Sequence, residues 1–116
     1  MSIKRYEQVG PYLNEAAAYG GVVYLAGLTA DDLSQDIRGQ TEQTLAHIER
    51  VLAQAGSSKS KLLRVEVWLV DMADFDAMNE VYVAWLDPHN VPARVCVESR
   101  LWDEAVKVEI MVTAVV

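Results

Sequence analysis

The first quarter of the chain alternates between turn residues and short apolar stretches that have the composition of β-strands. Residues 3–8 predict a short polar-edged strand, and a Gly-Pro turn then leads into a second strand at 13–19. Gly20-Gly21 predicts a hairpin turn, because paired glycines accept the positive φ that such turns need. The almost continuous apolar run at 22–28 predicts a strand that is buried on both faces. Gly27 within this run predicts a bulge or a close approach of another segment.

Two longer segments repeat apolar residues at the three- and four-residue spacing of amphipathic helices. The first is expected to begin at Asp36, a residue type that caps helices, and to run to about Ala55, where Gly56 ends it. The second is expected to begin near Asp71 and to end at 87–90, which has the composition of a turn. Their apolar stripes are Leu45, Ile48, Leu52 and Ala55 in the first helix and Phe75, Met78, Tyr82 and Trp85 in the second.

Three further strands are predicted in the second half of the chain. Strict alternation at 63–70 predicts a half-buried strand with Leu63, Val65, Val67 and Leu69 on its apolar side. Pro92 marks the beginning of a strand at 92–98. The last strand is predicted at 106–116. Its alternation places Lys107, Glu109, Met111 and Thr113 on one side and Val106, Val108, Ile110 and Val112 on the other.

This order of elements predicts an α+β fold, in which one mixed β-sheet has two helices packed on one face. The strand–helix–strand crossovers require at least some parallel pairing. The other face of the sheet has no cover within this chain. Because many of its strand residues are apolar, we expect the protein to associate with copies of itself.

Composition and charge narrow the classes of function. A chain of 116 residues, 52% hydrophobic and 23% charged, is typical of a single globular domain, here 1–116. The net charge of −7 argues against nucleic acid as a partner, since phosphate binding needs a basic surface. The one cysteine, Cys96, excludes an intramolecular disulfide. The sequence has no signal-peptide core and no run long enough to span a membrane, so we predict a soluble cytoplasmic protein.

The strand at 92–98 has the most unusual combination of side chains. Alternation places Arg94, Cys96 and Glu98 on one side of an otherwise apolar strand. One interpretation is a solvated edge, where Arg94 is free or paired with Glu98. The other is a pocket wall, where the planar guanidinium of Arg94 binds a substrate carboxylate. Cys96 alone has the character of a small buried residue.

Glu109 is the second candidate, because it lies among apolar residues, where an unpaired carboxylate is unfavourable. One alternative is a solvated sheet face that Glu109 shares with Lys107 and Thr113. The other is a polar site. If the last two strands are neighbours, Glu109 is expected close to Arg94, and this pair is expected to recognise and hydrate a small polar molecule.

Other kinds of site find no support in the sequence. His47 and His89 lie far apart, and one cysteine cannot complete a structural zinc site, so we predict no metal ligands. His47 is expected on the surface of its helix. No glycine-rich nucleotide loop is present, and no serine or cysteine nucleophile has a recognisable companion motif.

Eight short motifs occur in the order typical of the YjgF-like family, whose members are also called RidA-like proteins or reactive intermediate deaminases. They are Gly10-Pro11-Tyr12, Leu25-Ala26-Gly27, Gln43-Thr44-Leu45, Ala55-Gly56-Ser57-Ser58, Asp71-Met72-Ala73-Asp74-Phe75, Asn79-Glu80-Val81-Tyr82, Pro92-Ala93-Arg94 and Val108-Glu109-Ile110. Together these motifs extend over essentially the whole chain, which therefore resembles this family.

The resemblance implies a chorismate-mutase-like fold that assembles as a homotrimer with pockets between subunits. It also implies hydrolysis of reactive enamine and imine intermediates, such as 2-iminopropionate, to 2-keto acids and ammonia without a cofactor. Arg94 matches the arginine that holds the substrate carboxylate, and Glu109 matches the glutamate that positions the attacking water. By the same resemblance Tyr12, Gly27 and Cys96 are expected to contact the substrate.

The chain departs from the family pattern in one loop. Deaminating members have Ser-Gly-Gln where this chain has Ala26-Gly27-Leu28, and the change removes a hydroxyl group. Trp102 is expected either at the rim of the pocket or in a packing role. The alternative function is a non-catalytic trimer that binds small carboxylates in the same cleft, as a sensor or regulatory protein.

Overall fold

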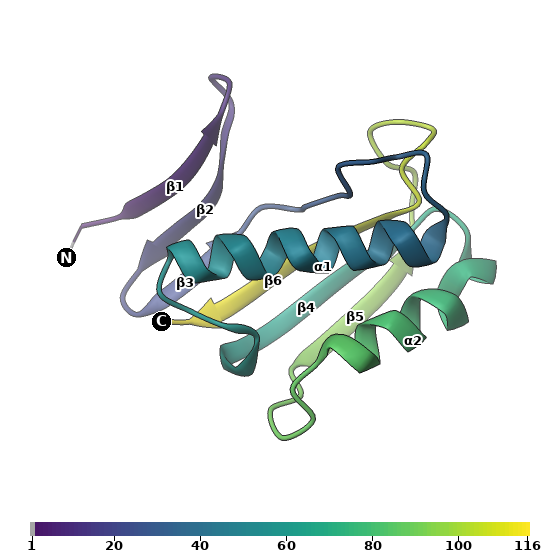
Figure 1. Cartoon of the computed structure of the whole chain (residues 1–116). Helices are drawn as coiled ribbons and strands as arrows, with labels where there is room; N and C mark the ends of the chain where they lie inside the picture. The colour runs from purple at the N-terminus through teal and green to yellow at the C-terminus, as the bar shows by residue number, and fades with distance from the viewer. Residues whose placement is uncertain (1) are drawn as a thin grey trace.

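The computed structural model describes residues 2–116 and contains a six-stranded sheet with two α-helices on one of its faces (Figure 1). The strands are β1 (Lys4–Val9), β2 (Leu13–Tyr19), β3 (Val22–Leu25), β4 (Leu62–Leu69), β5 (Ala93–Glu98) and β6 (Val108–Val115). The helices are α1 (Ile37–Gln54) and α2 (Phe75–Trp85), with 3₁₀ turns at Lys59–Lys61 and Met72–Asp74. In the described part of the chain, no helix has the length and apolar composition needed to cross a membrane. The predicted α+β architecture is confirmed.

The strands lie in the order β1-β2-β3-β6-β4-β5 across the sheet. β4 and β5 are parallel, and every other neighbouring pair is antiparallel. The parallel pair follows from α2, which connects β4 to β5 and carries the chain back along the sheet. β5 is therefore an edge strand, whereas β6, the last strand in the sequence, lies in the middle of the sheet. The predicted mixed sheet is confirmed.

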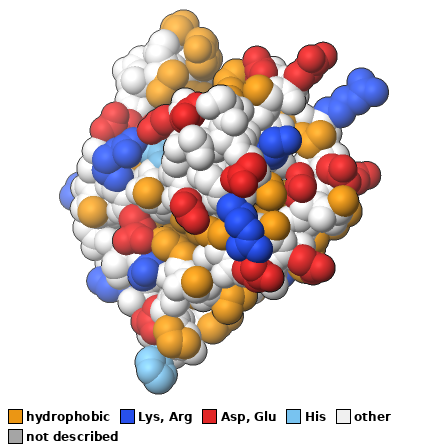
Figure 2. Space-filling model, turned by 45° about the vertical axis from the view of Figure 1, so that its right-hand side comes forward, with side chains coloured by type: hydrophobic (Ala, Val, Ile, Leu, Met, Phe, Trp, Pro, Cys, Tyr) orange, Lys and Arg blue, Asp and Glu red, His pale blue; other side chains and the backbone are white. Residues whose placement is uncertain are grey.

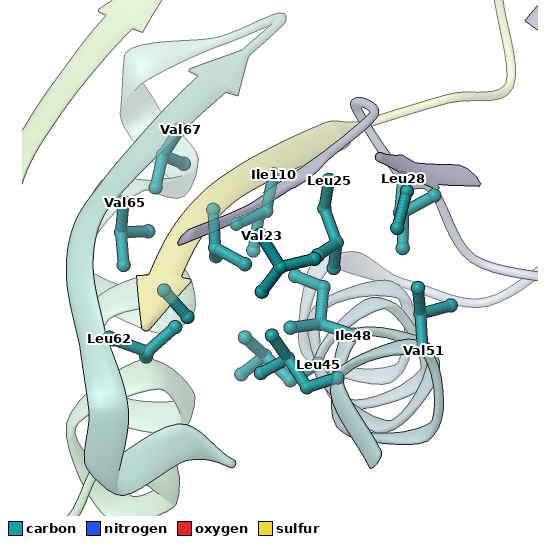
Figure 3. Close-up of a cluster of buried hydrophobic side chains, with 14 of the residues drawn as sticks. Val23, Leu25, Leu28, Leu45, Ile48, Val51, Leu62, Val65, Val67 and Ile110 are labelled. Carbon is teal, nitrogen blue, oxygen red and sulfur yellow. The ribbon is translucent and has the colours of Figure 1, made fainter. Parts of the chain in front are cut away.

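The hydrophobic core lies between the sheet and the helices. Figure 3 shows the side chains of Val23, Leu25 and Ile110 from the central strands turned toward Leu45 and Ile48 of α1. In β6 the buried residues are Val108, Ile110, Val112 and Ala114, which is the side that alternation predicts for the core. The opposite side of β6 therefore faces away from both helices.

The predicted start and end of α1 are confirmed by its capping contacts. The Asp36 side chain accepts a hydrogen bond of 2.9 Å from the backbone N–H of Gly39. Gly56, with φ of +78°, follows the last helical turn in the left-handed conformation that ends helices. Gly20 and Gly21, with φ of +61° and +82°, form the predicted turn between β2 and β3.

Three predicted details of the strands are wrong. The apolar run at 22–28 is not buried on both faces, since Tyr24 is 54% exposed and β3 takes only its first four residues. The helices cover one face of the sheet, so only one side of β3 meets them. A register shift after Leu62 places that residue in the core and leaves Leu63 exposed. β6 is also shorter than the predicted 106–116.

The sheet face opposite the helices has several apolar side chains. Strand pairing places them on a common side: Tyr24 of β3, Trp68 of β4, Val95 and Val97 of β5, and Met111 of β6. Each of these side chains is exposed or half-buried. Within residues 2–116 no helix covers this face (Figure 1). We call it the open face.

Gln40 of α1 is fully buried and ties two loops to the helix. Its Nε2 shares hydrogen bonds among the carbonyl groups of Leu33 (3.2 Å), Gln35 (3.1 Å) and Ala105 (2.9 Å). Its Oε1 accepts a hydrogen bond of 2.9 Å from the backbone N–H of Lys107. One amide thus joins the loop that precedes α1 to the loop that precedes β6.

Gln40→Leu is expected to lower the free energy of unfolding by about 2–4 kcal/mol, because three carbonyl groups and one backbone N–H lose the part-buried hydrogen bonds that Gln40 makes. Urea unfolding followed by far-UV circular dichroism measures the change. Gln54→Leu is the control, since its amide bonds Glu7 at an exposed position, and it is expected to cost less than about 1 kcal/mol. Equal losses in the two variants would contradict the role of Gln40.

Candidate functional site

Glu109 lies on the open face of β6, directly across from Trp68 of β4. Its side chain is half-buried, and this burial raises the pKa of the carboxyl group above its usual value. The carboxylate packs against Gly27. A Cβ atom added at Gly27 would overlap it, lying 2.9 Å from its Cδ. Gly27 therefore allows the close approach that the sequence predicts at this position.

The segment that includes Gly27 is fixed by backbone hydrogen bonds on both sides. The N–H of Ala26 donates to the carbonyl of Glu15 at 2.8 Å. Leu28 and Ile110 exchange two hydrogen bonds of 2.9 and 3.0 Å, so the segment is joined to β6 next to Glu109. This pairing fixes the position of the Gly27 backbone relative to the Glu109 carboxylate.

Glu109 and Gly27 line a cavity of about 720 Å³ together with Tyr12 and Trp102. The aromatic side chains of Tyr12 and Trp102 are 75% and 67% exposed, so they form the rim of the cavity. The Tyr12 ring lies over Gly10, which has φ of +53°. Three of the predicted site residues, Tyr12, Gly27 and Glu109, thus meet in one cavity, and Trp102 takes the first of its two expected positions.

His47 and Glu15 also line this cavity, and the sequence does not indicate them. His47 Nε2 lies 3.0 Å from Glu15 Oε2, and the side chains are only 11% and 17% exposed. The expected surface position of His47 is therefore wrong. His47 Nδ1 is buried and has no hydrogen-bond partner among the residues described. The sequence contains one indication of this burial: His47 follows Gln40 and Thr44 at helical spacing, and those two polar residues lie on the buried side of α1.

Arg94 lies on the edge strand β5, on the side that faces α2. Its guanidinium donates a hydrogen bond of 2.5 Å from Nη1 to Asn79 Oδ1. Its Cζ lies 4.9 Å from the ring centroid of Tyr82 and 5.5 Å from that of Phe75. Glu98, which was expected as a partner in one interpretation, instead accepts a hydrogen bond from the backbone N–H of Met72. Arg94 is thus exposed at the edge of the sheet, but its guanidinium is held there by α2.

Cys96 lies on the same side of β5 as Arg94, two residues further along the strand, and is half-buried. Burial raises the pKa of the Cys96 thiol, and the positive charge of Arg94 opposes that effect only in part. Cys96 packs against the hydrophobic core and lies outside the cavity lined by Glu109, and a raised thiol pKa does not favour a role as a nucleophile.

Arg94 and Glu109 do not meet within one chain. β4 lies between β5 and β6, so the expectation of neighbouring last strands is wrong. In addition, Arg94 pairs with Val65, which is buried toward the helices, whereas Glu109 pairs with Trp68 on the open face. The two groups therefore lie on opposite faces of the sheet, and only a second copy of the chain can bring an Arg94 to the Glu109 cavity.

The family model described as Endoribonuclease L-PSP matches residues 2–116, and solved structures that superpose on this fold include a named member of the YjgF protein family. The chain belongs to the YjgF family. That solved member, NMB1025 from Neisseria meningitidis, superposes with a TM-score of 0.95 at 37% identity, over 99% of this chain and 95% of its own.

Curated relatives are similar over most of their length. A RutC family protein from Haemophilus ducreyi is 40% identical over 103 residues, which cover 89% of this chain and 88% of that protein. The RutC family protein YoaB from Escherichia coli is 35% identical, again over 103 residues, or 89% of this chain and 90% of YoaB. The family resemblance predicted from the eight motifs is confirmed, as is the YjgF-like fold.

Among residues 2–116, no three His, Cys, Asp or Glu side chains are grouped so that they could hold a metal ion. His47 and Glu15 are an isolated pair. The polar side chains that line the cavity include Tyr12, Glu15, His47 and Glu109, whereas Arg94 lies on the other face of the sheet.

Proposed function

We propose that this protein hydrolyses reactive 2-imino acids, including 2-iminopropionate, to 2-keto acids and ammonia. The observation that supports the proposal best is the placement of Glu109. Its carboxylate is partly desolvated, has a raised pKa and packs on Gly27 in a cavity with an aromatic rim. A carboxylate in such surroundings is suited to take a proton from water near neutral pH.

Arg94 is the proposed binding group for the substrate carboxylate. The guanidinium plane matches a carboxylate in a bidentate arrangement, and this arrangement also fixes the orientation of the neighbouring imine carbon. The imine carbon of a protonated 2-imino acid is already electrophilic, so the reaction needs no cofactor to activate it.

The reaction is an addition of water followed by loss of ammonia. Glu109 accepts a proton from water while the water oxygen forms a bond to the imine carbon, and the C=N π electrons move to nitrogen. Glu109 then returns the proton to the nitrogen, the C–N bond breaks with its electron pair leaving on ammonia, and the oxygen loses its proton to solvent as the keto group forms. One water is consumed, and one 2-keto acid and one ammonia are released.

We propose that the working site forms between copies of the chain, in a homotrimer. Arg94 and Glu109 lie on opposite faces of the sheet, so a cleft that contains both requires two neighbouring chains. The open face, with Tyr24, Trp68 and Met111, offers apolar area for such an assembly. Light scattering tests this point, because a stable monomer would contradict the shared cleft.

The matching family model is described as an endoribonuclease, but the charge of this chain favours a small anion over RNA. The net charge is −7, and Figure 2 shows acidic and basic side chains interspersed on the face in view, without a continuous basic patch there. RNA binding depends strongly on clustered Lys and Arg. A single oriented guanidinium is sufficient for one substrate carboxylate.

The decisive experiment measures keto-acid formation from 2-iminopropionate, which an amino-acid oxidase generates in situ, with and without this protein. We expect acceleration by the wild type and a loss of at least about 10²-fold in Arg94→Ala, since a charge-assisted bidentate contact is removed. If a folded, trimeric protein accelerates none of several imino acids, deamination is excluded. Binding of 2-keto acids in that case would support the alternative, a non-catalytic carboxylate-binding protein.

A further inference from the structure

We propose that Asn79 is a positioning residue for Arg94: its amide oxygen holds Nη1 and leaves the opposite edge of the guanidinium for the substrate carboxylate. The inference deepens the proposed function and rests on it, because it describes how the binding group of that site is oriented. It requires no new ligand.

Arg94 needs such support because of where it lies. It is an exposed residue on an edge strand, and arginine has several rotatable bonds, so an unsupported guanidinium would occupy many positions. Phe75, Asn79 and Tyr82 are spaced by four and three residues and therefore share one face of α2. The guanidinium lies beside the two rings and hydrogen-bonds the amide between them.

The contacts leave specific donors of Arg94 unused. A guanidinium has five N–H donors, and the hydrogen bond to Asn79 uses one of them, on Nη1. The rings of Tyr82 and Phe75 contact the guanidinium without accepting a conventional hydrogen bond. Within the described residues the edge formed by Nε and Nη2 makes no hydrogen bond or ion pair, and this edge has the geometry for a bidentate carboxylate.

The neutral charge of Asn79 matters as much as its hydrogen bond. A carboxylate at this position would form an ion pair with Arg94 and compete with the substrate. α2 has acidic residues close by, at Asp76 and Glu80, but Glu80 binds Arg38 at 2.5 Å, away from Arg94. An amide thus faces Arg94 on a helix that is otherwise acidic at its exposed polar positions.

The test compares Asn79→Asp and Asn79→Leu with the wild type, using 2-iminopropionate turnover and calorimetric binding of pyruvate. Asn79→Asp is expected to raise KM for the imine and Kd for pyruvate by about 10-fold or more at neutral pH, with kcat changed much less. Asn79→Leu is expected to raise both by a smaller factor. Glu80→Gln, an acid-to-amide change at the neighbouring residue, is the control and should leave both unchanged.

A pH series separates positioning from a merely structural role. In Asn79→Asp the neighbouring Arg94 lowers the pKa of the introduced carboxylate, so pyruvate affinity relative to wild type should begin to recover only as the pH falls below about 4. A general packing defect would not recover in this way. Thermal unfolding shows that each variant is folded, and Asn79→Asp has the same shape as the native residue.

The outcomes distinguish this inference from the proposed function. Unchanged KM and Kd in both Asn79 variants, with binding lost in Arg94→Ala, would overturn the role of Asn79 and leave the function intact. Unchanged binding in Arg94→Ala would remove the binding role of Arg94, and the inference about Asn79 with it. Higher KM and Kd with pH-dependent recovery supports both.

Discussion

Glu109→Gln is expected to reduce the turnover of 2-iminopropionate by about 10²–10⁴-fold, the range typical of a positioned general acid–base group. Glutamine keeps the size of the side chain against Gly27 but cannot accept a proton from water. Binding of pyruvate depends on Arg94 instead, so its Kd should change by less than about threefold. Initial rates of keto-acid formation and isothermal titration calorimetry measure the two quantities.

The pH profile gives an independent reading of the same residue. Burial raises the pKa of Glu109, and the group acts as a base only when it is ionised. As the pH decreases, the turnover rate is therefore expected to begin falling at a higher pH than it would if the base were an exposed carboxylate. Glu109→Gln should lack this limb in its residual activity.

Stability should respond to Glu109 with a defined sign. Because the pKa is raised in the folded state, the contribution of the protonated group to stability is present below the unfolded pKa and is lost as the pH rises through the folded pKa. Glu109→Gln should therefore have the same free energy of unfolding in urea as the wild type at about pH 4 and a somewhat higher one at about pH 7.

Full turnover in Glu109→Gln would exclude Glu109 as the proposed base. Glu42→Gln, on an exposed part of α1, controls for the loss of one negative charge in both the turnover and the stability measurements.

Two inactive variants are expected to restore activity when they share one assembly. Arg94→Ala lacks the binding group and Glu109→Gln lacks the base, but the proposed cleft takes these residues from different chains. When equal amounts are unfolded together and refolded, about a quarter of the clefts should contain both native residues if subunits mix at random. The measurement is turnover of 2-iminopropionate by the refolded mixture, relative to refolded wild type.

Each variant refolded alone is the control for this experiment, and each should stay inactive. The same two proteins mixed without unfolding should gain activity only as fast as subunits exchange. A refolded mixture that is trimeric by light scattering and has no activity would contradict the shared cleft, because it would mean that both residues must belong to one chain.

Alternation along single strands was the most informative part of the sequence. In β6 the buried valines and isoleucine determine which way the strand faces, so the side on which Glu109 lies could be predicted without knowing any neighbour. The same reasoning places Arg94, Cys96 and Glu98 together on β5. Capping and glycine patterns, such as Asp36 and Gly56, gave the ends of α1 because those signals are local.

Contacts between distant segments could not be predicted in the same way. The order of the strands depends on pairing between residues far apart, and the insertion of β4 between β5 and β6 has no local signal. The Glu15 partner of His47 is 32 residues away, on another element. Asn79 and Tyr82 approach Arg94 from α2, and a strand pattern does not indicate what lies opposite it.

The contact between Gly27 and Glu109 means that shape, rather than polar bonding, orients the carboxylate. Among the hydrogen bonds and ion pairs of residues 2–116, none engages Glu109, whereas the absent side chain at Gly27 leaves a recess that its carboxylate fills. No donor among these residues therefore occupies its lone pairs, although burial covers part of the carboxylate. Gly27 thus fixes the position of the Glu109 carboxylate by its shape alone and takes no part in bond making. Saturation mutagenesis should nevertheless find as few tolerated substitutions at position 27 as at Glu109.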